Sequence, residues 1–182
     1  MRKLTHSEIS RNRLGPGEVE NAPRLPVFGL LDNIRSLYNV GSIFRSSDGA
    51  FLSHLFLTGY TPHPPRKEIN KTALGATKTI PWSYHRDPME AVADARARGA
   101  RICVLEHTSG SIPYYEVKPE WFPVCLVIGN ELTGVSPELI AAADVALEIP
   151  MFGTKQSLNA AVAFGIAVFE LGRIFRKVPG RG

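Results

Sequence analysis

Cysteine is scarce in this chain of 182 residues, because only Cys103 and Cys125 occur, and both stand in apolar runs. The chain has no CxxC pair, so we expect two reduced thiols in the core rather than a disulfide framework. The five histidines are scattered and never fall at an HxxxH spacing. No motif therefore indicates a zinc site, and we expect no metal.

Long hydrophobic runs are missing as well. The longest covers residues 160–169, which is far shorter than the ~20 residues that a helix needs to cross a bilayer. Residues 1–13 are polar and basic, unlike a secretory signal. These absences argue against a membrane protein and predict a cytoplasmic location.

Familiar ligand-binding and catalytic signatures are also absent. A phosphate-binding loop reads GxxxxGK[ST], whereas Gly153-Thr154-Lys155 has those letters in the wrong order. The dinucleotide fingerprint GxGxxG and the hydrolase elbow GxSxG do not occur. A serine triad stays open at this point, because its members need not be neighbours in sequence.

The chain is moderately basic, with 21 Lys and Arg residues against 17 Asp and Glu and a formal net charge of +4. This balance suits a polyanionic partner without demonstrating one. Residues 1–25 hold several arginines and are interrupted by prolines and glycines, so we expect a basic arm that is flexible or loosely docked. Such an arm either contacts RNA or is a solvated tail. The remaining residues, 26–182, are enough for one domain.

Beyond this arm the pattern of apolar residues alternates between strands and helices. Near-continuous apolar runs predict strands at residues 27–31, 54–58, 101–105, 124–128 and 145–149. Helices are predicted at residues 39–53, from Pro88 behind the cap Asp87 to Gly99, from Pro137 behind Ser136, and from the cap Ser157 toward Lys177. Clustered prolines at residues 61–66 predict a loop. We therefore expect an α/β fold with a mostly parallel sheet and helices on both faces.

The last predicted helix is apolar almost all round between residues 160 and 169. A helix on the outside of a monomer is expected to keep one polar face. We therefore expect this helix to be covered twice, by the protein's own sheet and by a second subunit.

Polar residues and glycines gather in three segments that follow predicted strands. The first runs from Asn33 through Asn39 to Arg45, the second covers residues 127–136, and the third covers residues 149–159. Ligands in open α/β sheets bind outside the carboxyl ends of strands, so all three segments are well placed for a site. Each also has a plain structural interpretation, in which Arg45 lies over apolar surface and Ser136 and Ser157 are only helix caps.

In this order, the three segments resemble the motifs of the SPOUT superfamily of RNA methyltransferases, and within it the TrmH (SpoU) family of ribose 2′-O-methyltransferases. The resemblance spans roughly residues 33–170. It is carried by Asn39 with Arg45, by the loop Gly129-Asn130-Glu131, by the stretch at residues 71–76, and by Met151, Gly153, Ser157, Leu158 and Asn159 in register.

This resemblance implies an α/β knot, in which the C-terminal segment is threaded through a loop as a trefoil and forms the cofactor pocket. It also implies a homodimer with active sites at the subunit interface, in agreement with the doubly covered last helix. The cofactor would be S-adenosyl-L-methionine (SAM), bound around Ile128, Gly129, Asn130, Ile149, Met151, Gly153, Ser157 and Leu158. Main-chain groups can read a purine edge, so these side chains need only shape the pocket.

The implied reaction is methyl transfer to a ribose 2′-hydroxyl of tRNA or rRNA. The family pattern places Arg45 at this step, surrounded by Asn39, Glu131, Ser157 and Asn159. Arg45 would be either a general base or, because a guanidinium normally stays charged, a cation that binds phosphate and stabilises the developing alkoxide. Glu131 is expected to orient Asn39 or Arg45.

RNA selection would use exposed cations of the catalytic domain, and the candidates are Arg35, Arg66, Lys67 and Lys71. Phosphate contacts supply affinity but little sequence information, so the RNA target stays open. Two other functions stay open on the same fold, an RNA-binding protein without catalysis and an RNA base methyltransferase. The presence of Arg45 and of the 149–159 loop favours an enzyme, and the set Asn39, Arg45, Ser157 and Asn159 favours ribose as the acceptor.

Overall fold

The computed structural model describes residues 1–11, 13–15 and 17–177. Their centre is a seven-stranded sheet with the order β3-β2-β1-β6-β4-β7-β5, in which every neighbouring pair of strands is parallel. The strands are β1 (Leu25–Asp32), β2 (Leu52–Thr58), β3 (Trp82–His85), β4 (Arg101–Leu105), β5 (Ile112–Pro113), β6 (Val124–Ile128) and β7 (Val145–Glu148). The expected parallel sheet is confirmed. Its central strands β1 and β6 are buried along nearly their whole length, which explains their continuous apolar sequences.

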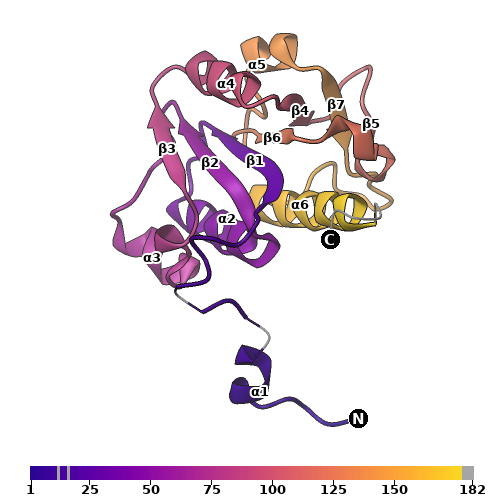
Figure 1. Ribbon diagram of the computed structural model, residues 1–182. Helices are drawn as coiled ribbons and strands as arrows, with labels where there is room; N and C mark the ends of the chain where they lie inside the picture. The colour runs from indigo at the N-terminus through magenta and orange to yellow at the C-terminus, as the bar shows by residue number, and fades with distance from the viewer. Residues whose placement is uncertain (12, 16, 178–182) are drawn as a thin grey trace.

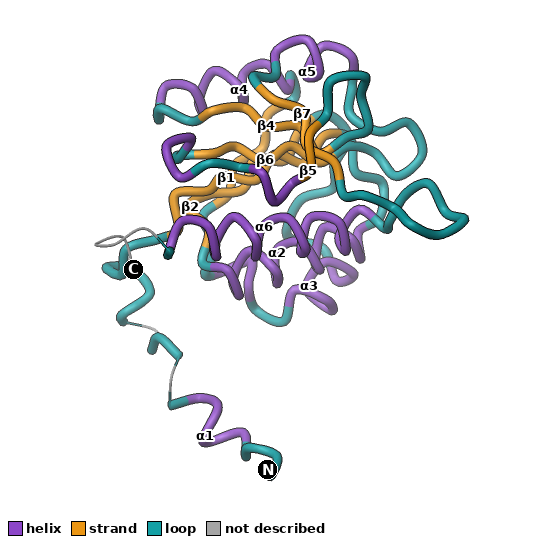
Figure 2. The backbone as a smooth tube through the Cα atoms, turned by 90° about the vertical axis from the view of Figure 1, so that its right-hand side faces the viewer, coloured by secondary structure: helices purple, strands orange, loops and turns teal. Residues whose placement is uncertain are grey.

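Helices cover both faces of the sheet, as Figure 2 shows. Helices α4 (Pro88–Ala97) and α5 (Pro137–Ala142) lie on one face, and α2 (Leu37–Ala50), α3 (Lys67–Ala73) and α6 (Ala160–Arg176) lie on the other. Two separate apolar clusters fill the spaces between these layers. Phe164 of α6 and Phe44 of α2 belong to the larger cluster, while Val92 of α4 and Leu139 of α5 belong to the smaller one. The result is a three-layer α/β/α arrangement that leaves the strand ends open.

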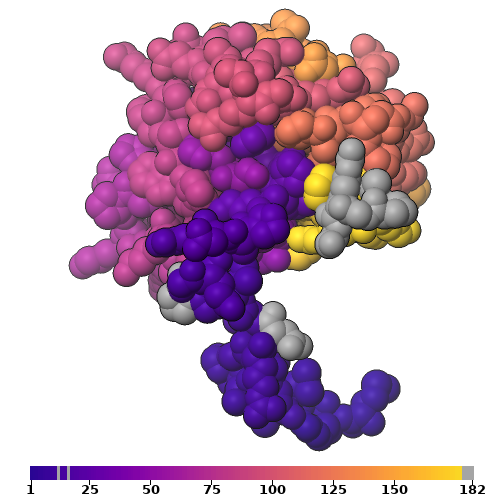
Figure 3. All heavy atoms as spheres, viewed as in Figure 1, coloured from indigo at the N-terminus to yellow at the C-terminus, as the bar shows by residue number. Residues whose placement is uncertain are grey.

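The segment before β1 extends away from this body and carries the short helix α1 (His6–Ser10), as Figures 1 and 3 show. Thr5 and Glu8 form a capping box at its start, and no residue of α1 is buried. Three short 3₁₀ helices complete the described structure: η1 (Ala76–Lys78), η2 (Tyr114–Glu116) and η3 (Pro119–Trp121). None of the described helices is long and apolar enough to span a membrane.

Local sequence signals fix several helix ends correctly. Asp87 accepts a hydrogen bond of 2.8 Å from the backbone N–H of Met89 and caps α4, with Pro88 at its first position.

The predicted helix at 39–53 is α2, but it begins at Leu37 and ends at Ala50. It ends early because Phe51 adopts the left-handed conformation, with φ of 61°, and β2 starts at the next residue.

The prediction that Ser157 caps the last helix is wrong. Helix α6 begins at Ala160, and the side chain of Asn159 accepts hydrogen bonds from the N–H groups of Ala161 and Val162. Residues 150–159 form no regular element, so Ser157 stays in the loop that leads into α6. The edge strands β3 and β5 and the short helix α3 were not predicted, because their sequences are brief and no continuous apolar run marks them.

Candidate active site

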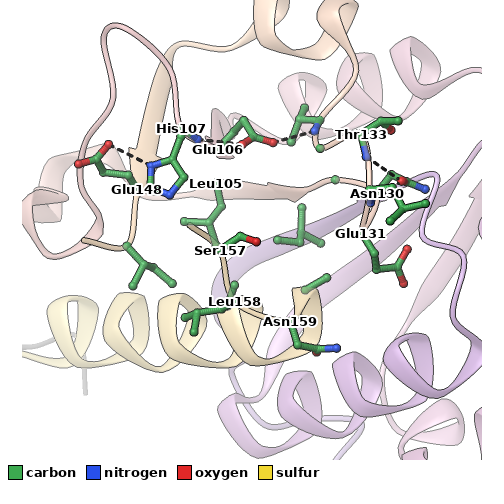
Figure 4. Close-up of a pocket in the computed structure, with 18 of the residues that line it drawn as sticks. Leu105, Glu106, His107, Asn130, Glu131, Thr133, Glu148, Ser157, Leu158 and Asn159 are labelled. Atoms are coloured by element: carbon green, nitrogen blue, oxygen red, sulfur yellow. Dashed lines mark hydrogen bonds and ion pairs between the residues drawn. The ribbon is translucent and has the colours of Figure 1, made fainter. Parts of the chain in front are cut away.

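A cavity of about 550 Å³ lies at the carboxyl ends of β4, β6 and β7, beside the start of α6 (Figure 4). Its walls are therefore formed by loops that are far apart in sequence, as expected for a ligand site in an open α/β sheet. The lining residues are Leu105, Glu106, His107, Ile128, Gly129, Asn130, Glu131, Leu132, Thr133, Gly134, Val135, Ile140, Glu148, Ile149, Met151, Ser157, Leu158, Asn159, Ala160 and Ala163.

The loop after β6 folds back on itself as a tight turn. The backbones of Asn130 and Gly134 pair across it, and the Asn130 side chain accepts hydrogen bonds from the N–H groups of Leu132 (2.8 Å) and Thr133 (3.0 Å). A Cβ atom on Gly129 would lie 2.2 Å from the carbonyl carbon of Gly134. Glycine is therefore required at position 129 by the turn's own backbone, in addition to its place in the cavity wall.

Glu131 connects this turn to the start of α2. One carboxylate oxygen accepts a hydrogen bond from the N–H of Arg35 (2.9 Å), and the other accepts from the N–H of Ser36 (3.0 Å) and from Asn39 Nδ2 (2.8 Å). Burial opposes the ionised form of Glu131, but these hydrogen bonds outweigh burial and lower its pKa. Glu131 is therefore a charged anchor for the loop that follows β1.

Asn39 continues this connection to α6. Its Oδ1 accepts a hydrogen bond of 3.1 Å from Asn159 Nδ2, while Asn159 Oδ1 caps α6. The Glu131–Asn39–Asn159 chain thus joins the three segments in which the sequence predicted a site. Of the two residues that Glu131 was expected to orient, Asn39 is the one bonded to it. No hydrogen bond or ion pair between Glu131 and Arg45 is present in the described residues.

A second network lies behind the turn, and sequence reasoning did not find it. Buried Asp32 accepts a hydrogen bond of 2.8 Å from the N–H of Ser136, and buried Asn130 donates to the carbonyl of Asn33 and to the phenol oxygen of Tyr60, both at 2.7 Å. Asp32 and Ser136 are 104 positions apart. This network fixes the β6 turn against the ends of β1 and β2.

Carboxylates dominate the polar part of the cavity wall, and two of them come from positions that the sequence analysis passed over. Glu106 accepts hydrogen bonds from the N–H groups of Val135 and His107, both at 2.9 Å. A hydrogen bond from Ser111 is the main cause that lowers the pKa of Glu148, and His107 lies 3.5 Å from the same carboxylate. One signal in the sequence could have identified Glu106 and Glu148, because both stand at the ends of predicted strands.

The wall also holds Glu131 and has no Lys or Arg among the described residues that line it. A cavity with three carboxylates and no cation to balance them favours a ligand that carries positive charge.

The structure brings together most of the predicted site residues. The following line the cavity: Ile128, Gly129, Asn130, Glu131, Ile149, Met151, Ser157, Leu158 and Asn159. Asn39 lies one hydrogen bond behind them. Gly153 does not line the cavity, and a Cβ atom added to it would meet no atom within 4 Å.

Arg45 stands apart from this site. It is exposed on α2, does not line the cavity, and has no hydrogen bond or ion pair with any described residue. Six residues separate it from Asn39, which at 3.6 residues per turn places the two side chains on different faces of α2. A Cβ atom added to Gly49, one turn further on, would lie 3.3 Å from the Phe169 ring of α6. Residues four apart share a helix face, so Arg45 lies on the face of α2 that Phe169 of α6 approaches.

The cations predicted to bind RNA are all exposed. Arg35 lies next to the cavity, because its N–H group is bonded to Glu131. Arg66 is the residue before α3, and Lys67 and Lys71 lie within that helix. No group of acidic, histidine or cysteine side chains suited to a metal ion occurs among the described residues.

Together, the fold and the cavity define an α/β protein with a ligand site at the carboxyl ends of a parallel sheet. Residues 26–169 match the model of the SpoU rRNA Methylase family. The chain belongs to this family.

Named relatives include tRNA and rRNA enzymes. The tRNA (guanosine(18)-2′-O)-methyltransferase of Aquifex aeolicus is 33% identical over 143 residues, covering 78% of this chain and 66% of the relative. The enzyme of the same name from Thermus thermophilus is 31% identical, and the match covers 95% of this chain and 86% of the relative. The Bacillus subtilis 23S rRNA (guanosine(2553)-2′-O)-methyltransferase RlmP is 30% identical, and the match covers 78% of this chain and 56% of the relative. The chain thus spans slightly less than two thirds of the Aquifex relative.

Solved structures agree with this assignment. The TrmH/SpoU tRNA modifying enzyme of A. aeolicus superposes with a TM-score of 0.77 at 29% identity, covering 87% of this chain and 80% of that one. The AdoMet-bound rRNA methyltransferase of Sinorhizobium meliloti superposes with a TM-score of 0.76 at 30% identity, covering 84% and 61%.

Proposed function

We propose that this protein is a SAM-dependent RNA methyltransferase that methylates a ribose 2′-hydroxyl of tRNA or rRNA. The observation that carries the proposal is the Glu131–Asn39–Asn159 chain, which joins all three motif segments at the edge of one cavity. The names of the relatives support both the reaction and the two classes of RNA.

The cavity suits SAM as the cofactor. Its volume of about 550 Å³ is within the usual range for small-molecule sites, and apolar residues such as Leu105, Ile149 and Leu158 offer walls for a purine. The carboxylates of the wall would attract the positively charged sulfonium and ammonium groups. We assign cofactor contact to Ile128, Gly129, Asn130, Ile149, Met151, Ser157 and Leu158, with Gly153 in the adjoining loop. When bound, SAM supplies the methyl group.

Ser157 and Asn159 have different roles in this proposal. The Ser157 hydroxyl lines the cavity and makes no hydrogen bond to a described residue, so it is available to contact the ribose hydroxyl or its neighbouring phosphate. The Asn159 side chain is already bonded to Asn39 and to the start of α6. Asn159 is therefore a positioning residue that keeps α6 and α2 in register.

The exposed apolar side of α6 supports a homodimer. Val162, Ile166 and Phe169 are 50%, 37% and 52% exposed, and they follow one another at helical spacing. We define these three residues as the α6 stripe and propose that a second copy covers it. Because Arg45 lies on the same side, it would act at the interface, on RNA bound in the partner's cavity. There its charge would bind a phosphate and stabilise the developing alkoxide, while a phosphate oxygen or water takes the proton.

The remaining architecture follows from the family. We propose that residues 26–182 form the SPOUT catalytic domain, that residues 1–25 are a basic arm, and that the protein acts in the cytoplasm. We also propose that the C-terminal segment is threaded as a trefoil knot.

Transfer of labelled methyl groups from SAM to total tRNA and total rRNA tests the function. After nuclease digestion, mass spectrometry should find the label on the ribose of a nucleoside. Label on a base would instead favour the base methyltransferase. Calorimetric titration with SAM separates the other alternative, because an RNA-binding protein without catalysis would bind no SAM.

A further inference from the structure

Tyr60 is an exposed aromatic residue that is held by hydrogen bonds both at its backbone and at its phenol oxygen. Its backbone N–H donates to Asn33 Oδ1 (3.1 Å), and its phenol oxygen accepts from Asn130 Nδ2 (2.7 Å). The side chain is nevertheless 62% exposed. Gly59 precedes it with φ of +63°, and a Cβ atom there would collide with the Asn33 side chain. The turn after β2 is thus built to hold Tyr60 at this place.

The anchor of Tyr60 belongs to the wall of the cavity. Asn130 is only 6% exposed, and its amide makes four hydrogen bonds, which is its full capacity. One of these bonds ends on Tyr60. The ring therefore stands beside the cavity with its orientation coupled to the β6 turn. A rigid exposed ring loses little conformational entropy when a planar group stacks on it.

A second fixed aromatic residue lies beside the same turn. Tyr84 of β3 is 41% exposed, and its phenol donates a hydrogen bond of 2.6 Å to the carbonyl of Gly59. The ring of His63 lies 4.8 Å from the ring of Tyr84, measured between centroids. Aromatic side chains thus lie both in the loop that starts at Tyr60 and on the strand β3, which pairs with β2 (Figure 1).

Cations follow this aromatic group along the chain. The loop leads directly into α3, and residues 66–78 hold Arg66, Lys67, Lys71 and Lys78 against the single acidic residue Glu68. Arg35 stands two residues after Asn33, whose side chain binds the N–H of Tyr60. Aromatic platforms among positive charges are typical of surfaces that bind unpaired nucleotides.

We infer that Tyr60 stacks on an unpaired RNA base next to the ribose that enters the cavity, with Tyr84 and His63 beside it and the cations of α3 on the phosphates. This inference rests on the proposed function, because a ribose can reach the cavity most readily from a nucleotide outside a duplex. It assigns Tyr60 a direct contact with substrate, and it identifies a single-stranded or looped RNA as the preferred partner.

The test measures binding of fluorescently end-labelled unfractionated tRNA, and separately of total rRNA fragments, over a series of salt concentrations. Tyr60→Ala should weaken binding about tenfold without changing the slope of log affinity against log salt, because stacking involves no counterion release. Tyr60→Phe keeps the ring and should stay within about threefold of the wild type. Lys71→Ala should instead reduce the slope by about 1.

Tyr115→Ala is the matched control, since Tyr115 is a similarly exposed tyrosine (52%) on η2. It should bind RNA like the wild type. Calorimetry with SAM checks that the cavity is intact in each variant. Tyr60→Leu, which keeps apolar bulk but has no aromatic face, repeats the test if Tyr60→Ala does not fold. Wild-type affinity in Tyr60→Ala or Tyr60→Leu, or an equal loss in Tyr60→Phe, would overturn the inference.

The two proposals fail in different ways. If the wild type binds RNA through Tyr60 but transfers no methyl group, the proposed function is wrong and the stacking contact stands. If methyl transfer is normal and its KM for RNA is unchanged in Tyr60→Ala, the stacking contact is wrong and the proposed function stands. A wild type that binds neither RNA preparation overturns the stacking contact.

Discussion

Asn39 and Arg45 lie on the same helix, yet their surroundings are opposite. Asn39 is partly buried and is bonded to Glu131 and Asn159 at the edge of the cavity. Arg45 is exposed and has no bonded partner among the described residues. One chain therefore holds Asn39 in place by itself, whereas no described residue of that chain holds the Arg45 side chain. Under the proposed function, the site is preorganised on the Asn39 side, and RNA and a second copy would complete it on the Arg45 side.

Among variants that fold, the largest expected loss of methyl transfer is at Arg45. Arg45→Ala should lower methyl transfer by at least about 100-fold, because it removes a charge that acts on the transition state. Arg45→Lys should also be poor, since an ammonium lacks the planar fork that binds phosphate through two hydrogen bonds. SAM affinity and the free energy of unfolding should stay near those of the wild type. Near-normal turnover in either variant would remove Arg45 from the mechanism.

Glu131→Gln should affect both stability and activity. The amide keeps the shape of the side chain but not its charge. A hydrogen bond to a charged group contributes about 1.5–3 kcal/mol to the free energy of unfolding. We expect a loss of about 2 kcal/mol in the free energy of unfolding and at least a tenfold loss of methyl transfer. Denaturant unfolding and initial rates measure the two effects. A variant as stable and as active as the wild type would show that Glu131 does not anchor the loops.

The stability of the wild type and of Glu131→Gln can also be compared as a function of pH. The pKa of Glu131 is lowered in the folded protein from its ordinary value of 4.5, so folding favours the ionised form. The contribution of Glu131 to the free energy of unfolding is therefore fully present above pH about 4.5, and it is lost as the pH falls through the lowered pKa. The stability difference between wild type and Glu131→Gln should be constant near neutrality and should narrow in acid. A difference that widens in acid would contradict this assignment.

Two phenylalanines of α6 separate packing from assembly. Phe164 is fully buried, while Phe169 in the α6 stripe is 52% exposed. Phe164→Glu should prevent folding, because it buries an unpaired charge. Phe169→Glu should fold and sediment as a monomer, with reduced methyl transfer. A Phe169→Glu protein that stays dimeric would place the interface elsewhere.

Gly129 and Gly153 differ in the space around them, and the smallest effect of all is expected at Gly153. Gly129→Ala should destabilise the protein by about 1–3 kcal/mol, because the added carbon meets backbone atoms. Gly153→Val has open space and should fold with wild-type stability, with SAM affinity within about threefold. Thermal melting and calorimetry make the comparison. Severe loss of SAM binding in a folded Gly153→Val would place residue 153 in the cofactor site.

Sequence alone predicted the strands at residues 101–105 and 124–128 with their exact ends, and the cap Asp87, because these signals are local. It missed contacts that only the fold creates, such as Asp32 with Ser136 and Asn130 with Tyr60. Placing the cap at Ser157 failed because Asn159 offers an equally good cap two residues later, and a local pattern cannot choose between them.

The most direct measurement mixes two inactive variants. Arg45→Ala and Asn39→Ala are co-expressed with different tags, the mixed dimers are purified, and the yield of 2′-O-methyl nucleoside from RNA and SAM is determined. If Arg45 serves the partner's cavity, each mixed dimer has one complete site, and its activity should return to about half that of the wild-type dimer. No return of 2′-O-methyl product in the mixed dimer, beside an active wild type, would contradict a site completed by the second copy.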